Sequence, residues 1–199
     1  MKSIIISNSN ELREYKMRIA DGDEFKLLLL LTGELTGTLN LSYSLSNKSS
    51  LNLYLLTALS GKSDLAINYC AKHSGRESHS VFNICGTLDD KAKLNTDMKI
   101  FFENGSLNAT GIEKEDIILL SDESHNVVSP IIISDEESAS GNHSSSIGHI
   151  DYAQIEYLHR KGISQSEAKK ILINAKFKSF LSMIDDENIL KSIHRMMKI

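Results

Sequence analysis

Thiol, imidazole and carboxylate groups are the side chains of this 199-residue sequence that could take part in chemistry. The thiols are Cys70 and Cys85, whose spacing predicts neither a disulfide framework nor a zinc site. Both lie in segments of alternating polarity, so we interpret them as structural residues that pack like small hydrophobic side chains. Among the seven histidines, His143 lies in the polar, serine-rich stretch 134–145. We interpret this stretch as a loop, where a histidine is either functional or simply solvated.

Three carboxylates form a second candidate group. Asp89, Asp90 and Asp97 could supply the acid and the base that cleavage of a glycosidic bond requires. No aromatic platform for a sugar ring accompanies them, and the G-x-S-x-G and G-x-G-x-x-G patterns are absent from the sequence. A carbohydrate-active solenoid enzyme is therefore kept as an alternative hypothesis.

Composition and charge exclude several classes of protein. The net charge is -4 and the pI is near 6.0, so the chain lacks the basic face typical of nucleic-acid binding. The longest apolar run, 27–31, is far too short to span a bilayer. The amino terminus has too short an apolar run for a secretory signal. We therefore expect a cytoplasmic protein without a membrane or nucleic-acid partner, and 41% hydrophobic residues are enough for a core.

The elements that would position these side chains change in type along the chain. Apolar and polar residues alternate over most of the first 133 positions, as in half-buried strands; Leu39, Leu41 and Tyr43, for example, share one face. Short strands separated by Gly, Asn, Asp and Ser predict an all-β sandwich, barrel or solenoid, and periodicity does not choose among them.

Helical periodicity begins after residue 150. Asp151 is the expected N-cap of a first helix, and Gly162 is its expected C-cap. Ser164 and Glu167 predict a capping box at the start of a second helix. A third helix is expected over 186–197. These short helices cannot bury their apolar faces alone, so we expect them to pack on the β-rich part or on another protein.

Several separated motifs around His143 keep the spacing of a known family. They are His143, Gly148, Asp151, Tyr157-Leu158, Lys161-Gly162-Ile163, the segment 117–124 and Pro130. Over roughly residues 70–177 the sequence resembles the SufB/SufD family, the scaffold proteins of the SUF system of iron–sulfur cluster assembly. Lys161 takes the place of the family's usual arginine, and Phe177 lies one position later than expected.

The resemblance selects one fold and one set of partners. It implies a right-handed parallel β-helix over residues 1–148 with a small helical subdomain over 149–199. It also implies a non-catalytic scaffold that dimerises through its last strands, around 117–133, with itself or with a SufB/SufD-type partner. The helices would bind the ABC-type ATPase SufC. A regulatory relative that binds SufC without handling a cluster is a further alternative.

The resemblance also implies site residues. His143 matches a histidine implicated in forming or holding a transient iron–sulfur cluster, and a neutral imidazole is a suitable ligand for iron. Glu115 stands where SufB-type members carry a cysteine, and Ser144 stands where they carry a glutamate, so the chain is more like SufD. Glu115 is a candidate ligand; the alternative is a solvent-facing carboxylate in a charged run. The residues expected to bind SufC are Tyr157, Leu158, Lys161, Gly162, Ile163, Ala168, Ile171, Leu172 and Phe177.

Overall fold

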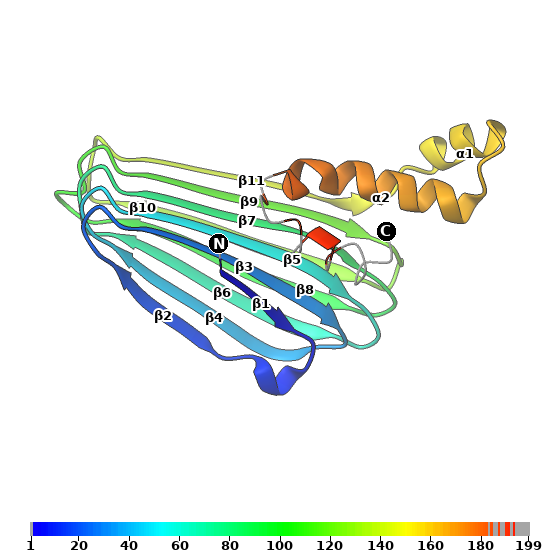
Figure 1. The fold of residues 1–199 in the computed structure, drawn as a ribbon, viewed down its shortest axis with the longest axis horizontal. Helices are drawn as coiled ribbons and strands as arrows, with labels where there is room; N and C mark the ends of the chain where they lie inside the picture. Colours follow the sequence, from blue (N-terminus) through cyan, green and yellow to red (C-terminus); the bar gives the residue numbers. More distant parts are fainter. Residues whose placement is uncertain (1, 183, 185–186, 188–189, 192, 194–199) are drawn as a thin grey trace.

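The computed structural model describes residues 2–182, 184, 187, 190–191 and 193, and most of them form a parallel β-solenoid (Figure 1). Successive strands belong alternately to two sheets, so that each coil contributes one strand to each sheet. Every strand pairing is parallel and in continuous register. This arrangement confirms the predicted β-helix.

Within the described residues the sheets have six and five strands. The first, called sheet A, runs in the order β1 (Lys2–Ile6), β3 (Glu24–Gly33), β5 (Ser50–Leu59), β7 (His79–Leu88), β9 (Thr110–Leu119) and β11 (Ser140–His149). The second, called sheet B, runs in the order β10 (His125–Ser134), β8 (Lys93–Phe102), β6 (Asp64–His73), β4 (Thr36–Leu45) and β2 (Glu14–Ile19). A 3-10 turn, η1 (Ser9–Glu11), separates the first two strands.

Aliphatic side chains fill the interior because the coils stack in register. Leu53 of β5 pairs with Leu27 of β3 on one side and with Phe82 of β7 on the other. Residues paired in this way point to the same face of a sheet, and alternate residues along each strand point inward. All three side chains are buried. The interior is thus a set of columns, each built from one position of every coil.

A recurring serine closes the turns between strands. Its hydroxyl donates a hydrogen bond to the backbone carbonyl three residues earlier, which satisfies an acceptor that the strands leave unpaired. The serines are Ser49, Ser63, Ser78, Ser106 and Ser124, with Oγ to O distances of 2.7–2.8 Å. All five serine residues are buried. The same local hydrogen bond therefore reverses the chain at both ends of the coils.

The helices begin as the sequence predicts. Asp151 caps α1 (Tyr152–Arg160) by accepting a hydrogen bond from the Ala153 amide, and Gly162 follows the helix with a φ of 89°. Ser164 and Glu167 form the capping box of α2 (Gln165–Leu181). The third helix expected over 186–197 falls largely outside the described residues.

Helix α2 packs on the outer face of sheet A. Phe177 and Phe180 are buried in one cluster with Leu28 of β3, Leu56 of β5 and Ile118 of β9. Tyr54 meets Phe180 edge-on, with ring centroids 6.1 Å apart. The expectation that the helices pack on the β-rich part is therefore confirmed for this face of α2.

The stretch 134–145 is not the loop that its composition predicts. Residues from Ser140 onward belong to β11, which pairs with β9 along its whole length. Its serine side chains give no signal of a strand, but an exposed strand needs only backbone pairing with its neighbour, and such context overrides propensity. His143 therefore lies in the middle of a strand.

One polar group lies deep in the interior near the end of β6. The ring nitrogens of His73 lie 2.8 Å from Ser78 Oγ and 2.8 Å from Ser80 Oγ, and the ring packs against Phe102. Ser78 Oγ donates to Gly75 O, so it accepts from Nδ1 of His73, and Nε2 is left to accept from Ser80. Burial lowers the pKa of His73 to about 4.

We predict that His73 makes the fold sensitive to acid. Between pH 6.5 and pH 4 the unfolded chain binds a proton at this imidazole and the folded protein does not, so the free energy of unfolding falls as the pH falls. At about 1.4 kcal/mol per pKa unit, the loss is about 2–3 kcal/mol. Urea denaturation at pH 7 and pH 4.5 measures it. His73→Gln should flatten this dependence, and His125→Gln, at an exposed position, should not; equal slopes in the two variants would contradict the assignment.

Candidate functional site at the open end of the solenoid

The last coil, formed by β10 and β11, leaves the interior open at one end of the solenoid. Among the described residues both strands are the terminal members of their sheets, so each has one unpaired edge there. Inward positions that are buried in earlier coils are partly exposed here, as for Val128 and Pro130 of β10. On β11, His143 and Ser145 are exposed. The predicted site residue His143 therefore lies at the mouth of the interior.

Glu115 lies one strand beneath this mouth and is fully buried. Its Oε1 atom accepts hydrogen bonds from Asn126 Nδ2 at 2.7 Å and from Thr96 Oγ1 at 3.4 Å. Burial raises the pKa of Glu115 to about 7, against the opposing effect of these two hydrogen bonds. The interpretation of Glu115 as a solvent-facing carboxylate is wrong, because its position on β9 points into the solenoid.

A second buried carboxylate, Glu113, lies two residues earlier on the same face of β9. Neither of its oxygens has a hydrogen-bond partner among the described residues, and burial raises its pKa to about 8. Sequence reasoning missed Glu113. The signal was available, since Gly111, Glu113, Glu115 and Ile117 alternate as the inward positions of a strand do.

The register brings the site residues of neighbouring strands together. His143 of β11 pairs with Glu113 of β9, and Ser145 pairs with Glu115. Paired residues of a parallel ladder share a face, so His143 lies over Glu113 rather than directly over Glu115. The structure thus places both predicted ligands, His143 and Glu115, on the inward face at the same end of the solenoid.

The two thiols lie elsewhere. Cys85 is buried on the outer face of sheet A, in the cluster that contains Phe177 of α2. Cys70 is half-buried on the outer face of sheet B, in a shallow groove that Asp97 and Lys99 also line. The interior end therefore offers oxygen and nitrogen donors, whereas iron–sulfur clusters are normally held by thiolates. These residues alone do not fit a cluster.

The residues expected to bind SufC fall into two groups. Ala168 and Phe177 are buried, and Phe177 packs α2 on sheet A. Tyr157 and Ile171 are 62% and 45% exposed, and Lys161 lies over the Tyr157 ring at 5.7 Å. The other expected residues are partly or fully exposed: Leu158, Gly162, Ile163 and Leu172. A groove of about 710 Å³ runs along α2, lined by Ile171, Asn174, Ala175, Lys178, Leu181, Ser182 and Leu190.

Comparison with known families assigns the chain. The family model for the SUF system FeS cluster assembly SufBD core domain matches residues 7–176. The chain belongs to this family. It is also 27% identical over 121 residues to the iron–sulfur cluster assembly protein SufD of Bacillus subtilis strain 168. That alignment covers 59% of this chain and 27% of the Bacillus protein, so the chain spans only about a quarter of its relative.

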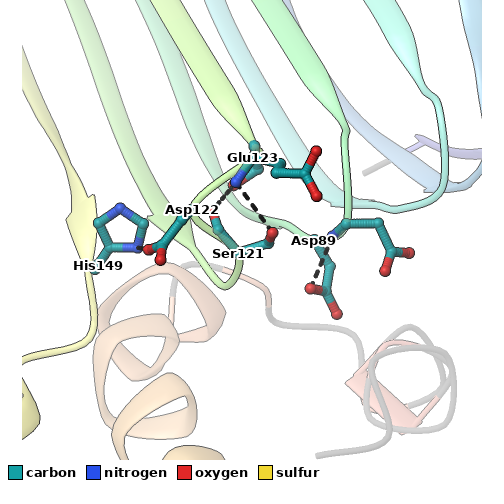
Figure 2. Close-up of polar contacts among 7 residues, drawn as sticks. Asp89, Ser121, Asp122, Glu123 and His149 are labelled. Atoms are coloured by element: carbon teal, nitrogen blue, oxygen red, sulfur yellow. Dashed lines mark hydrogen bonds and ion pairs between the residues drawn. The ribbon is translucent and has the colours of Figure 1, made fainter.

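The acidic residues of the carbohydrate hypothesis do not form one site in this SufBD domain. Figure 2 shows Asp89 in a loop at the end of the coils, where Ser121, Asp122 and His149 also lie. Asp90 accepts a hydrogen bond from the Gly61 amide in the same turn region. Asp97 is in the middle of β8, on the outer face of sheet B. Asp89 and Asp90 lie in the turn before β8, so Asp97 does not form an acid–base pair with either of them.

The described part of the SufBD domain contains no helix that is both long and apolar enough to cross a membrane.

We predict that Glu113 destabilises the domain at alkaline pH. Its pKa is raised from 4.5 to about 8, so between these values the folded protein holds a proton that the unfolded chain has lost, and stability falls as the pH rises. Glu113→Gln should raise the free energy of unfolding by about 4–5 kcal/mol at pH 9, at about 1.4 kcal/mol per pKa unit, and change it little at pH 4.5. Urea denaturation in a chelating buffer measures both values. Glu137→Gln, at an exposed position, is the matched control. A Glu113→Gln protein that is no more stable than wild type at pH 9 would disprove the buried charge.

Proposed function

We propose that this SufBD domain is a non-catalytic scaffold subunit of a SUF-type iron–sulfur cluster assembly complex in the cytoplasm. The observation that carries the proposal is the family match over residues 7–176, which includes every coil from β2 onward, α1 and most of α2. In this proposal residues 1–148 form the scaffold, and residues 149–199 form the part that binds the SufC-type ATPase.

Dimerisation would close the open end of the solenoid. In the part of the chain that the structure describes, the edges of β10 and β11 have no neighbouring strand, and pairing with another chain would satisfy their backbone groups. Outward apolar residues on β10 support this role, since Val127, Ile131 and Ile133 are between 40% and 56% exposed. The partner is a second copy or a SufB/SufD-type protein.

We predict that a charge on the terminal strand breaks the dimer. Val127→Lys places an ammonium group beside the free edge of β10, where a partner strand would have to desolvate it. Sedimentation velocity should show a monomer for Val127→Lys and a dimer for wild type. Met17→Lys is the matched control, because Met17 is equally apolar, 41% exposed, and lies on β2 at the opposite edge of the same sheet. A Val127→Lys protein that still dimerises would remove this interface.

The nascent cluster would be handled at this interface as cargo. His143 would contribute an imidazole and Glu115 a carboxylate, while thiolates would come from the cysteine-bearing partner, since this chain has none at that end. Reconstitution with iron and sulfide without oxygen, followed by absorbance, tests the role, with His143→Ala and Glu115→Ala as variants.

The missing thiols also favour a second candidate, a relative that binds the ATPase without handling a cluster. A wild-type chain that forms no cluster in this reconstitution would favour it.

Docking of a SufC-type ATPase would use the exposed residues of the helices. Tyr157 and Ile171 are large, apolar and accessible, and the groove along α2 continues from Ile171. An amphipathic surface of this kind accepts an apolar side chain of a partner protein. ATP-driven closure of two bound ATPases would then shift the scaffold interface at His143.

We predict that the double variant Tyr157→Ser, Ile171→Ser weakens binding of the ATPase at least tenfold. Both side chains are exposed, so their removal should leave the circular dichroism spectrum and the melting temperature unchanged. Co-purification with the ATPase and titration calorimetry measure the effect. Met17→Ser, which removes an exposed apolar side chain far from the helices, should bind like wild type. A wild-type chain that does not associate with the ATPase would count against the proposed function as a whole.

A further inference from the structure

The interior of the solenoid changes from aliphatic to polar over its last two coils. In one column Leu53 and Phe82 are followed by Glu113 and then by His143. In the neighbouring column Leu55 and Ile84 are followed by Glu115 and then by Ser145. Both columns are therefore apolar in the middle of the solenoid and carry oxygen and nitrogen atoms where it opens.

Four oxygen atoms in this polar part have no hydrogen-bond partner among the described residues. They are both carboxylate oxygens of Glu113, Oε2 of Glu115 and Oδ1 of Asn126. Glu113 and Glu115 are completely inaccessible to solvent. Buried acceptors are almost always satisfied in folded proteins, and leaving them unpaired is costly. Unpaired acceptors at two successive inward positions of β9, and on the Asn126 side chain that contacts one of them, indicate a ligand that supplies positive charge.

No cationic side chain takes this role in the described part of the chain. None of the ion pairs there includes Glu113 or Glu115. The groups that contact Glu115 are neutral, namely the Asn126 amide and the Thr96 hydroxyl. Two other titratable groups face Glu113: the buried Tyr69 hydroxyl, which is neutral because burial raises its pKa, and His143, which pairs with Glu113 and lies at the exposed mouth.

The spacing allows both carboxylates to reach one ion. Residues i and i+2 of a strand point to the same face with Cα atoms about 6–7 Å apart, which two extended glutamate side chains can bridge around a cation. Asn126 approaches from the opposite sheet, since its Nδ2 lies 2.7 Å from Glu115 Oε1. Rotation of its amide would turn Oδ1 toward the same point.

We propose that the last two coils bind one divalent cation through the oxygens of Glu113, Glu115 and Asn126, and that the ion enters between His143 and Ser145. Carboxylate and amide oxygens select cations such as Mg²⁺ and Mn²⁺ over those that prefer thiolates. Two carboxylates match the charge of the ion. No three His, Cys, Asp or Glu side chains in the described residues converge as a metal-binding group, so water or a partner chain completes the coordination shell.

This inference rests on the proposed function only in sharing Glu115 and the open end. The cation site is a property of this chain alone, whereas the proposed function depends on partner proteins. Loss of cation binding and loss of ATPase binding are therefore separate outcomes.

Titration of the full chain with Mn²⁺ at pH 8, followed by the electron paramagnetic resonance signal of free Mn²⁺, tests the site. Wild type should bind one Mn²⁺ per chain. Glu113→Gln and Glu115→Gln should each weaken binding at least tenfold, and Asn126→Ala should weaken it less. Glu137→Gln is the control and should bind like wild type. Melting temperatures establish that the variants are folded, and Glu113→Gln is expected to be at least as stable as wild type.

Two results would overturn the proposal. One is a wild-type chain that binds no Mn²⁺ at millimolar concentration. The other is equal binding by wild type and by the folded Glu113→Gln and Glu115→Gln proteins, which would place the ion elsewhere. Co-purification of the same variants with the ATPase should be unchanged, which separates this test from that of the proposed function.

Discussion

Lateral stacking of coils in register is the constraint from which the rest of this molecule follows. Each inward side chain rests on the equivalent side chain of the neighbouring coil, and each strand satisfies its backbone groups through the strands beside it. This rule supports every coil except the outermost ones, which have a neighbour on one side only. The terminal coil formed by β10 and β11 therefore presents free backbone groups and an uncovered interior together. The free backbone groups and the uncovered interior occur at the same end because both result from the lack of a further coil there among the described residues.

Much of this architecture could be predicted from local sequence. Strand positions followed from alternation, and the caps at Asp151 and Ser164 followed from side chains that bond to the nearest backbone amides. Such signals work because their causes lie within a few residues. The right-handed parallel β-helix could not be derived from such local signals. It was predicted from the family resemblance around His143. The turn serines, four of which directly precede a strand, were a further local signal of a repeat.

The errors have a different physical origin. Residues 140–145 were assigned to a loop because their side chains are small and polar, yet they form a strand because β9 offers a free edge. Glu115 was weighed as a surface group because charged residues are seldom buried without partners. Its burial depends on the column in which it stands, and hence on residues 31 positions earlier and 30 positions later, Ile84 and Ser145. No local pattern contains that information.

The contact between α2 and sheet A has a mechanical consequence. The cluster around Phe177 and Phe180 takes side chains from β3, β5, β7 and β9, through Leu28, Leu56, Cys85 and Ile118. Helix α2 thus packs across four strands of sheet A and not on the outermost strand alone. A load applied to α2 is shared by these four strands, so it acts on the solenoid as one body and not on its last coil alone. A displacement of the helix would therefore be transmitted to several coils of the solenoid together.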